Sequence, residues 1–255
     1  IAAGQTKIVA TDGAGSGAVV YEMDDLELAG NLTVAGVLDV DGTANLDVID
    51  VDGAANFAAD VTFADGADII TASAGTSNLR LGVNAGNSIA SGGNYNTVVG
   101  DEAGTALTTG DANVAMGYQA LATEDAHGLN TAVGYQALKT LNAGADGNNT
   151  AVGYIAGVFI TTGVQNTLIG SLAGDALTTS NNNLAIGYKA LSADTVGTKT
   201  TAIGFEALMS QNFTTNTDSF NVAVGYTAGR EITTGIDNTL IGGKAGIALT
   251  DADEN

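Results

Sequence analysis

The stretch NTAVGYQAL at residues 130–138 decides how this sequence is expected to fold. It returns as NTAVGYIAG at 149–157 and as NVAVGYTAG at 221–229. Self-similarity at a fixed spacing is the signature of repeat architectures, in which each repeat packs mainly against its neighbours. The sequence therefore predicts a stack of similar units.

Aligning the repeats on their central glycine gives ten units at intervals of 17 to 21 residues. Asn stands four residues before the glycine in nine units, with Thr200 as the exception. Leu, Val, Met or Ile directly precedes the glycine, and Ala follows three positions after it, in every unit. The glycines are Gly82, Gly100, Gly117, Gly134, Gly153, Gly170, Gly187, Gly204, Gly225 and Gly242.

A longer pattern lies over these units. The residue after the Ala is Gly in two units and then Leu in the next two, alternating from Gly86 to Gly246, so that the larger unit contains four coils. Longer intervals follow Leu138 and Leu208, which predicts enlarged loops at one corner of the array. Asn255 takes the position that opens an eleventh unit. We therefore interpret the sequence as part of a longer polypeptide.

Each unit is expected to contain one short strand. Between the Asn and the Ala, β-branched, small and aromatic residues alternate, which is typical of a strand, while the many Gly, Thr and Asn disfavour helix. One turn per unit stacks equivalent strands roughly 4.8 Å apart, so ten coils form a body on the order of 50 Å long. Recurring residues then form columns: we expect the Asn column to bond to itself and to backbone, the aliphatic column to fill the interior, and the Ala column to mark close backbone approach.

The stretches between the strands have the composition of turns. Examples are LTTGDAN at 107–113, ITTGVQN at 160–166 and LTTSNNN at 177–183. Gly and Asn in these turns can adopt positive φ at little steric cost.

The first part of the chain follows another pattern. Residues 30–66 alternate apolar and polar residues, and VDGTANL at 40–46 returns as VDGAANF at 51–57. Short strands with DG turns fit this pattern, but such a run needs partners to bury its apolar face, and identical chains supply them. The expected fold is all-β, an elongated trimeric fibre with an intertwined β shaft and a parallel β-roll or β-solenoid of about 17-residue coils. Its expected segments are a linker or shaft piece at 1–29, a shaft and junction at 30–77, and ten coils at 78–255.

Composition excludes several classes of function. The 28 acidic and seven basic residues give a net charge of −21, which repels nucleic acid and anionic membrane surfaces. There is no apolar run of membrane-spanning length and no signal-peptide pattern at the start. Aromatic residues make up 5% of the chain, and Cys, Pro and Trp are absent, which argues against an ordinary enzyme. We expect no nucleic acid, no membrane insertion and no cofactor.

The N-[TV]-A-[VI]-G-Y-x-A-[LG] units resemble those in the head of trimeric autotransporter adhesins, where NSVAIG-type repeats form a left-handed parallel β-roll as a homotrimer. NLTVAGVLDVDG-type shaft repeats running into NTAVGYQAL-type repeats are more similar still to bacteriophage tail fibres, which are trimeric and serve host attachment. The resemblance covers residues 30–255. It implies an extracellular, virion-borne homotrimer whose partners are other virion or tail proteins and a host surface glycan or protein receptor.

Few side chains are candidates for chemistry. His127, the one histidine, follows Glu124 and Asp125, but a single His without Cys or repeated carboxylates is a poor metal or acid–base site, so we expect a solvated loop. DVDG at 39–42 and at 50–53 lacks the full calcium-loop spacing and is interpreted as outward Asp on shaft strands. No catalytic, metal-binding or cofactor-binding residue is therefore assigned.

Two features are candidates for recognition. Aromatic residues follow the motif glycine in six units and form either a sugar-binding strip or, as we expect, a stacked structural column. The non-repeating insertions at 141–149 and 209–221 can vary on a rigid scaffold without harm to the core, although ordinary corner loops are an equal alternative. No single receptor-binding residue is assigned. The aromatic residues are Tyr118, Tyr135, Tyr154, Tyr188, Phe205 and Tyr226.

These observations predict a structural component of a virion, a homotrimeric tail fibre or adhesin that attaches to a host cell, and not an enzyme. The alternative is a bacterial trimeric surface adhesin or extracellular filament. A β-solenoid enzyme acting on polysaccharide is less favoured, since neither six-residue hexads nor paired carboxylates are found. An ice-binding face would need a regular Thr array, and Leu or Val interrupts the Thr column at residues 79, 114, 184 and 222.

Overall fold

The computed structural model describes residues 74–255, which belong to the second of two units of the chain, residues 63–255. The predicted shaft, the proposed segment 1–29 and the DVDG stretches lie outside the described residues. Within residues 74–255 the chain is all-β without helix, as predicted. Accordingly, no helix in this part of the chain could cross a membrane.

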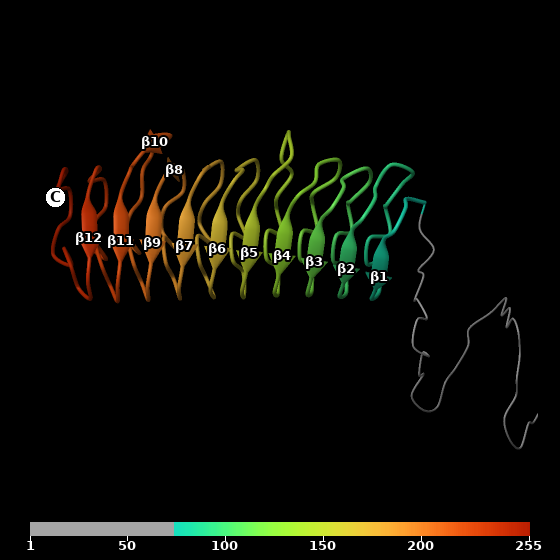
Figure 1. The fold of residues 1–255 in the computed structure, drawn as a ribbon, viewed down its shortest axis with the longest axis horizontal. Coiled ribbons are helices and arrows are strands. Elements are labelled where there is room, and N and C mark those ends of the chain that lie inside the picture. The colour runs from blue at the N-terminus through green and yellow to red at the C-terminus, as the bar shows by residue number, and fades with distance from the viewer. Residues whose placement is uncertain (1–73) are drawn as a thin grey trace, which may run out of the picture. The chain divides into compact units, whose positions relative to one another are not determined.

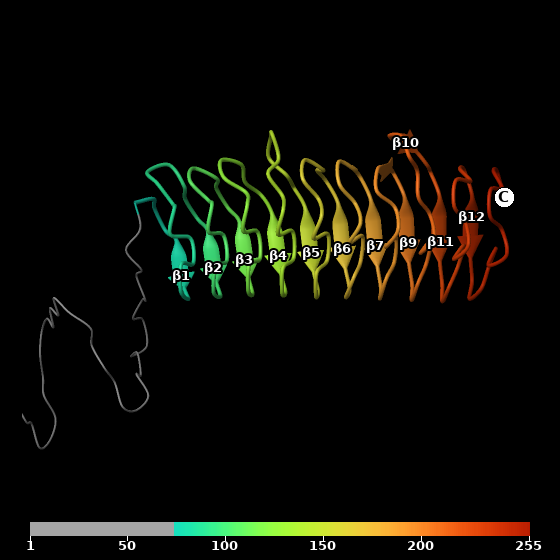
Figure 2. The same ribbon diagram turned by 180° about the vertical axis from the view of Figure 1, so that it is seen from behind.

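The chain winds as a parallel β-solenoid. Figures 1 and 2 show one strand per coil, side by side and in chain order, with the turns looping away from the strand row. Ten three-residue strands form one sheet in the order β1 to β7, β9, β11, β12. They are β1 (Leu79–Leu81), β2 (Thr97–Val99), β3 (Val114–Met116), β4 (Thr131–Val133), β5 (Thr150–Val152), β6 (Thr167–Ile169), β7 (Leu184–Ile186), β9 (Thr201–Ile203), β11 (Val222–Val224) and β12 (Thr239–Ile241).

The register confirms the predicted columns. Every neighbouring pair of strands is parallel, and equivalent positions of successive units face each other, as Ala132 faces Ala151 and Val133 faces Val152. The unit that the repeat defines in sequence is thus the unit that stacks in space. A separate pair of two-residue strands, β8 (Gly197–Thr198) and β10 (Thr217–Asp218), joins two of the loops.

The Asn column is a buried hydrogen-bond ladder, interrupted only at Thr200 within the described coils. The side-chain oxygen of Asn149 accepts the backbone N–H of Asn166 at 3.0 Å, and the Asn166 oxygen accepts that of Asn183 at 3.0 Å. The Asn166 amide also donates to the carbonyl of Ser180 in the following turn at 2.8 Å. Because each Asn serves both the strand entry and the turn, buried backbone groups are satisfied without longer strands. The predicted role of this column is confirmed.

The ladder is rebuilt where Thr200 replaces Asn. The Asn221 N–H, which has no Asn oxygen to meet, donates instead to Ser219 Oγ at 3.3 Å. The Asn221 amide donates to Gln211 Oε1 at 2.8 Å, and Gln211 Nε2 donates to Thr200 Oγ1 at 3.0 Å. The side chains of Thr200, Ser219 and Gln211 thus make the hydrogen bonds that a single Asn makes in the other coils, so the buried groups stay paired.

The interior is filled by positions other than the predicted one. The aliphatic residue before the motif glycine points outward, with Met116 40% and Ile169 37% exposed, so the prediction that this column fills the core is wrong. Because side chains alternate along a strand, it is the middle strand residue that points inward. That residue is buried from Val98 to Leu240, as is the Ala column from Ala85 to Ala228.

Close coil-to-coil contact explains the motif glycine. Gly134 has φ of +135°, and a Cβ there would lie 2.2 Å from the carbonyl oxygen of Gly153 in the next coil. The turn glycine Gly163 serves the same purpose without positive φ: its Cβ would lie 2.3 Å from the Ser180 carbonyl. Positive φ falls instead on residues such as Asn182, at 60°. Asn182 thus uses the positive φ that the turn composition allows, and Gly163 does not.

Candidate functional site

The two insertions stand out from the regular turns. Residues 141–149 lie between β4 and β5, and residues 209–221 lie between β9 and β11. In Figure 1 the turn after β4 and the loop bearing β10 rise above their neighbours along the same edge of the coil row. This confirms the prediction of enlarged loops at one corner. Their exposed residues are Asn142, Gly144, Ala145, Asp146, Asn148, Asn212, Thr214, Thr215, Asn216, Asp218 and Phe220.

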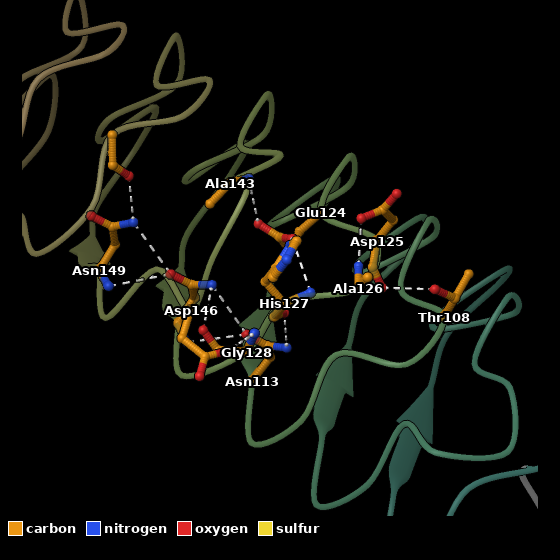
Figure 3. Close-up of polar contacts among 12 residues, drawn as sticks. Thr108, Asn113, Glu124, Asp125, Ala126, His127, Gly128, Ala143, Asp146 and Asn149 are labelled. Carbon is orange, nitrogen blue, oxygen red and sulfur yellow. Dashed lines mark hydrogen bonds and ion pairs between the residues drawn. The ribbon is translucent and has the colours of Figure 1, made fainter.

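A buried carboxylate supports the first insertion. Glu124 is fully buried, and its carboxylate accepts the N–H of Ala143 at 3.1 Å and that of His127 at 3.3 Å. Figure 3 shows this side chain between its own loop and the next one. Burial raises the pKa of the Glu124 carboxyl above its ordinary value, and the bonds from Ala143 and His127 oppose that shift. The expectation of a solvated loop is therefore wrong for Glu124.

The neighbours of Glu124 do not assemble a strong metal site. Glu124, Asp125 and His127 each bring a possible ligand atom within 4.8 Å of the others. His127 Nδ1 lies 3.6 Å from Glu124 Oε1, but both Glu124 oxygens already accept backbone N–H groups. Because both oxygens of Glu124 hold the backbone, only Asp125 and His127 remain as possible ligands. Two ligands are too few for a structural zinc site.

A second buried carboxylate, Asp194, supports the second insertion four coils after Glu124. Asp194 is fully buried and accepts the N–H of Gly197 at 2.9 Å and the Gln211 side-chain amide at 2.7 Å. It also lies 3.4 Å from the Phe213 nitrogen, which donates to it as Ala143 donates to Glu124. Burial raises the pKa of the Asp194 carboxyl, opposed first by the bond from Gln211.

Sequence reasoning missed Asp194, Gln211 and the role of Glu124, although a signal was present. These three occupy the column three positions after the Gly or Leu that follows Ala, where the other units carry Leu or Ile. A polar residue in an otherwise aliphatic column indicates a buried group with a specific partner. The aliphatic members of this column are Ile89, Leu107, Leu141, Ile160, Leu177, Ile232 and Leu249.

At the tip of the second insertion an ion pair lies beside an exposed aromatic ring. Lys199 Nζ lies 2.5 Å from Asp218 Oδ2 and 5.1 Å from the centre of the Phe220 ring. The hydrogen bond from Lys199 lowers the pKa of Asp218. Phe220 is 52% exposed. An exposed aromatic ring beside paired charges suits contact with a partner surface, and nothing in this tip resembles a nucleophile and base pair.

The aromatic residues after the motif glycine stack, as expected for a structural column. Ring centres lie 5.2 to 5.4 Å apart within two groups of three, and Ser171 occupies the position between the groups. All six rings are between 38% and 56% exposed. We call Tyr118, Tyr135 and Tyr154 the first stack and Tyr188, Phe205 and Tyr226 the second stack.

The outward side of the ten-stranded sheet is a long, mostly apolar face. It is formed by the first and third residues of each strand, which the solenoid itself leaves partly or largely exposed. The first residues are Thr, Val or Leu, and the third residues are aliphatic or Met. The third residues are Leu81, Val99, Met116, Val133, Val152, Ile169, Ile186, Ile203, Val224 and Ile241. We refer to these first and third positions together as the outer face.

None of the known protein-family models matches this chain, and no curated protein and no solved structure is significantly similar to it. Over residues 74–255 the fold defines the class of protein as a parallel β-solenoid of ten coils.

Proposed function

We propose that this chain is a structural subunit of a homotrimeric fibre, a bacteriophage tail fibre or a related adhesin, that supports attachment to a host cell surface. It works by length, stiffness and repeated display, and it is not an enzyme. The observation that carries the proposal is the outer face. A mostly apolar strip along the ten described coils is typical of an interaction surface, because monomeric proteins rarely expose large apolar patches.

Identical chains are the partner that fits this face. The face repeats at the coil spacing, so a partner with the same spacing and the same apolar columns matches it over the full length. Two further copies around a common axis give each chain two neighbours and close the assembly. The enlarged loops then occur three times at each level, so weak contacts add to strong attachment.

The loop architecture supports a role in recognition. Each insertion is exposed at its tip and anchored at its base by a buried carboxylate, Glu124 through Ala143 or Asp194 through Gln211. A rigid base with a variable tip is the usual arrangement of binding loops on scaffolds. The two tips follow the same edge of the solenoid (Figure 1), so a single surface could contact both.

Sedimentation of the full chain tests the assembly, with Ile186→Asp as the disrupting variant. Ile186 is the outward residue of β7, and a charge there would be buried among apolar side chains in the trimer. We expect a trimeric wild type and loss of the trimer in the variant. Thr162→Asp, at an exposed turn position, is the matched control and should remain trimeric. A monomeric wild type would remove the fibre proposal.

The location of the protein distinguishes a phage tail fibre from a bacterial surface adhesin or filament. Antibody labelling of purified virions is expected to mark fibres if the chain belongs to a phage. Labelling confined to a bacterial surface would favour the trimeric surface adhesin or filament instead. An enzyme acting on polysaccharide would instead release fragments when the native oligomer is incubated with capsular or cell-wall polysaccharide.

A further inference from the structure

The two aromatic stacks differ in the chemistry of their middle ring. The first stack consists of tyrosines only, whereas Phe205 lies between the two tyrosines of the second stack. In the first stack each tyrosine therefore stacks on a tyrosine of the next coil, with ring centres 5.3 Å and 5.4 Å apart. In the second stack both tyrosines stack on Phe205, so neither has a phenol beside it.

We propose that the first stack is a site of oxidative coupling, at which a one-electron oxidant joins tyrosines of adjacent coils through a carbon–carbon bond. The class of oxidant is a peroxidase supplied with hydrogen peroxide. Tyrosine is the side chain most open to such an oxidant, because the chain contains no Trp and no Cys. The three rings are 38%, 44% and 54% exposed, so the oxidant can reach each of them from solvent.

The arrangement of the rings suits this reaction. Coupling joins ring carbons beside the phenol oxygens, and these carbons must first come into contact at about 3.5–4 Å. The ring planes are inclined to each other by only 26° and 17°, and the strands that precede the rings pair in register. Equivalent ring atoms therefore follow one another along the column, and rotation of the exposed side chains brings them into contact.

The electrons and protons of the reaction balance. Each of two tyrosines gives up one electron and its phenol proton, which leaves two phenoxyl radicals. The radicals combine at ring carbons next to the oxygens, and the hydrogen on each of these carbons then moves to the oxygen beside it, which restores both phenols. Hydrogen peroxide takes up the two electrons and two protons and becomes two molecules of water.

The new bond would join coils that no disulfide can join, since the chain contains no Cys. A bond between Tyr135 and Tyr154 closes a loop that contains the first insertion and β5. Such a crosslink restricts the unfolded chain as a disulfide does. Both tyrosines belong to one chain, so this inference goes beyond the proposed fibre function and does not depend on it.

Oxidation of the full chain with a peroxidase and hydrogen peroxide tests the proposal. Fluorescence measures the dityrosine that forms, and peptide mapping by mass spectrometry identifies the joined peptides, which together have lost two hydrogen atoms. We expect the bonds to join Tyr135 to Tyr118 or to Tyr154. On a denaturing gel the coupled protein is expected to run as a single chain.

Exchanges between Tyr and Phe keep every ring and change only the phenols. Tyr135→Phe leaves two tyrosines roughly 10 Å apart along the axis, so dityrosine should fall at least tenfold. Tyr226→Phe is the matched control, because it also removes one phenol but no pair of adjacent tyrosines, and its yield should equal that of the wild type. Phe205→Tyr creates adjacent tyrosines in the second stack and should raise the yield about twofold.

Several results would overturn the proposal. It is wrong if the oxidised wild type contains no dityrosine, if folded Tyr135→Phe keeps more than half of it, or if the joined peptides contain tyrosines from outside the first stack. Covalent dimers or trimers that hold most of the dityrosine would also contradict it, because the proposed bonds lie within one chain. Thermal melting confirms folding, and if Tyr135→Phe does not fold, Phe205→Tyr decides: an unchanged yield means that stacking does not direct the coupling.

Discussion

Asparagine acts in this chain as a connector between coils. Each Asn of the buried ladder uses its oxygen for the next strand and its amide for the following turn, as Asn166 does with Asn183 and Ser180. A residue that is usually found in turns is suited to this place because its short side chain carries both an acceptor and donors. Thr200 shows the cost of losing it, since Ser219 and Gln211 are needed to pair the same groups.

A larger side chain at the Ala position should destabilise the fold more than a larger side chain at the position before it. Ala137 is fully buried in the core, whereas Gln136 is partly exposed and bonds to the side chain of Gln119. Ala137→Leu is expected to cost about 1–3 kcal/mol of stability or more through overpacking, and Gln136→Leu less than about 1 kcal/mol. Thermal melting of the two variants checks this, and equal losses would contradict it.

The buried Asp194 carboxyl should give stability a distinct pH dependence. Its pKa in the folded chain is raised above the ordinary 3.8, so between these two values the folded state holds a proton that the unfolded state has lost. The contribution of Asp194 to stability therefore falls as pH rises through this window and stays lower above it. Asp194→Asn removes the titrating group, so its melting temperature relative to wild type should increase with pH upward from 3.8.

The matched control for this experiment is Asp237→Asn, at an exposed position whose side chain makes no bond comparable to those of Asp194. Melting curves of the three proteins across the acidic range supply the comparison. A constant difference between Asp194→Asn and wild type at every pH would show that the carboxyl does not titrate in this window.

At the scale of the element, large side chains of one coil fill the space beside small residues of the neighbouring coils. Where the residue after Ala is Gly, large side chains from adjacent positions take the space: a Cβ on Gly157 would lie 2.7 Å from Leu168 Cδ1 and 3.0 Å from Leu138 Cδ2. Where it is Leu, as at Leu138, the middle strand residue is small, here Ala132. The four-coil period is therefore a packing period, in which large and small residues alternate along the axis.

Leu138→Ala tests this complementarity. The side chain is fully buried and contacts the position of Gly157, so its truncation should leave a cavity and cost about 2–5 kcal/mol. The outward Leu129, which is 48% exposed, is the control, and Leu129→Ala should cost far less. Denaturant unfolding measures both, and a small loss at Leu138 would mean that neighbouring coils collapse into the space.

At the scale of the whole molecule, charge and the outer face oppose each other. Each chain carries a net charge of −21, so three copies in the proposed trimer would repel one another, while burial of their outer faces would favour association. Raising the salt concentration from 0.01 M to 0.15 M shortens the screening length from about 30 Å to about 8 Å. The proposed trimer should therefore associate more tightly in the higher salt, as sedimentation at several protein concentrations would show. Weaker association would indicate that attractive ion pairs dominate the contact.

The candidate surfaces were only partly predictable. The stacked aromatic column and the enlarged corner loops follow from repeat spacing, because residues one period apart become neighbours in space. The burial of Glu124 and its bond to Ala143 do not, since they depend on how one loop lies over the next.

The sequence by itself determined the period, the strands, the Asn ladder and the place of the insertions. These are relations along the solenoid axis, where the chemistry of a column is repeated letter by letter. Only the tertiary structure decided which columns face the core, that the aliphatic residue before the motif glycine points outward, and that two carboxylates are buried beneath the loops. These features depend on which way each side chain points within a coil. How the turns close sets that direction, and the repeat period along the sequence does not specify it.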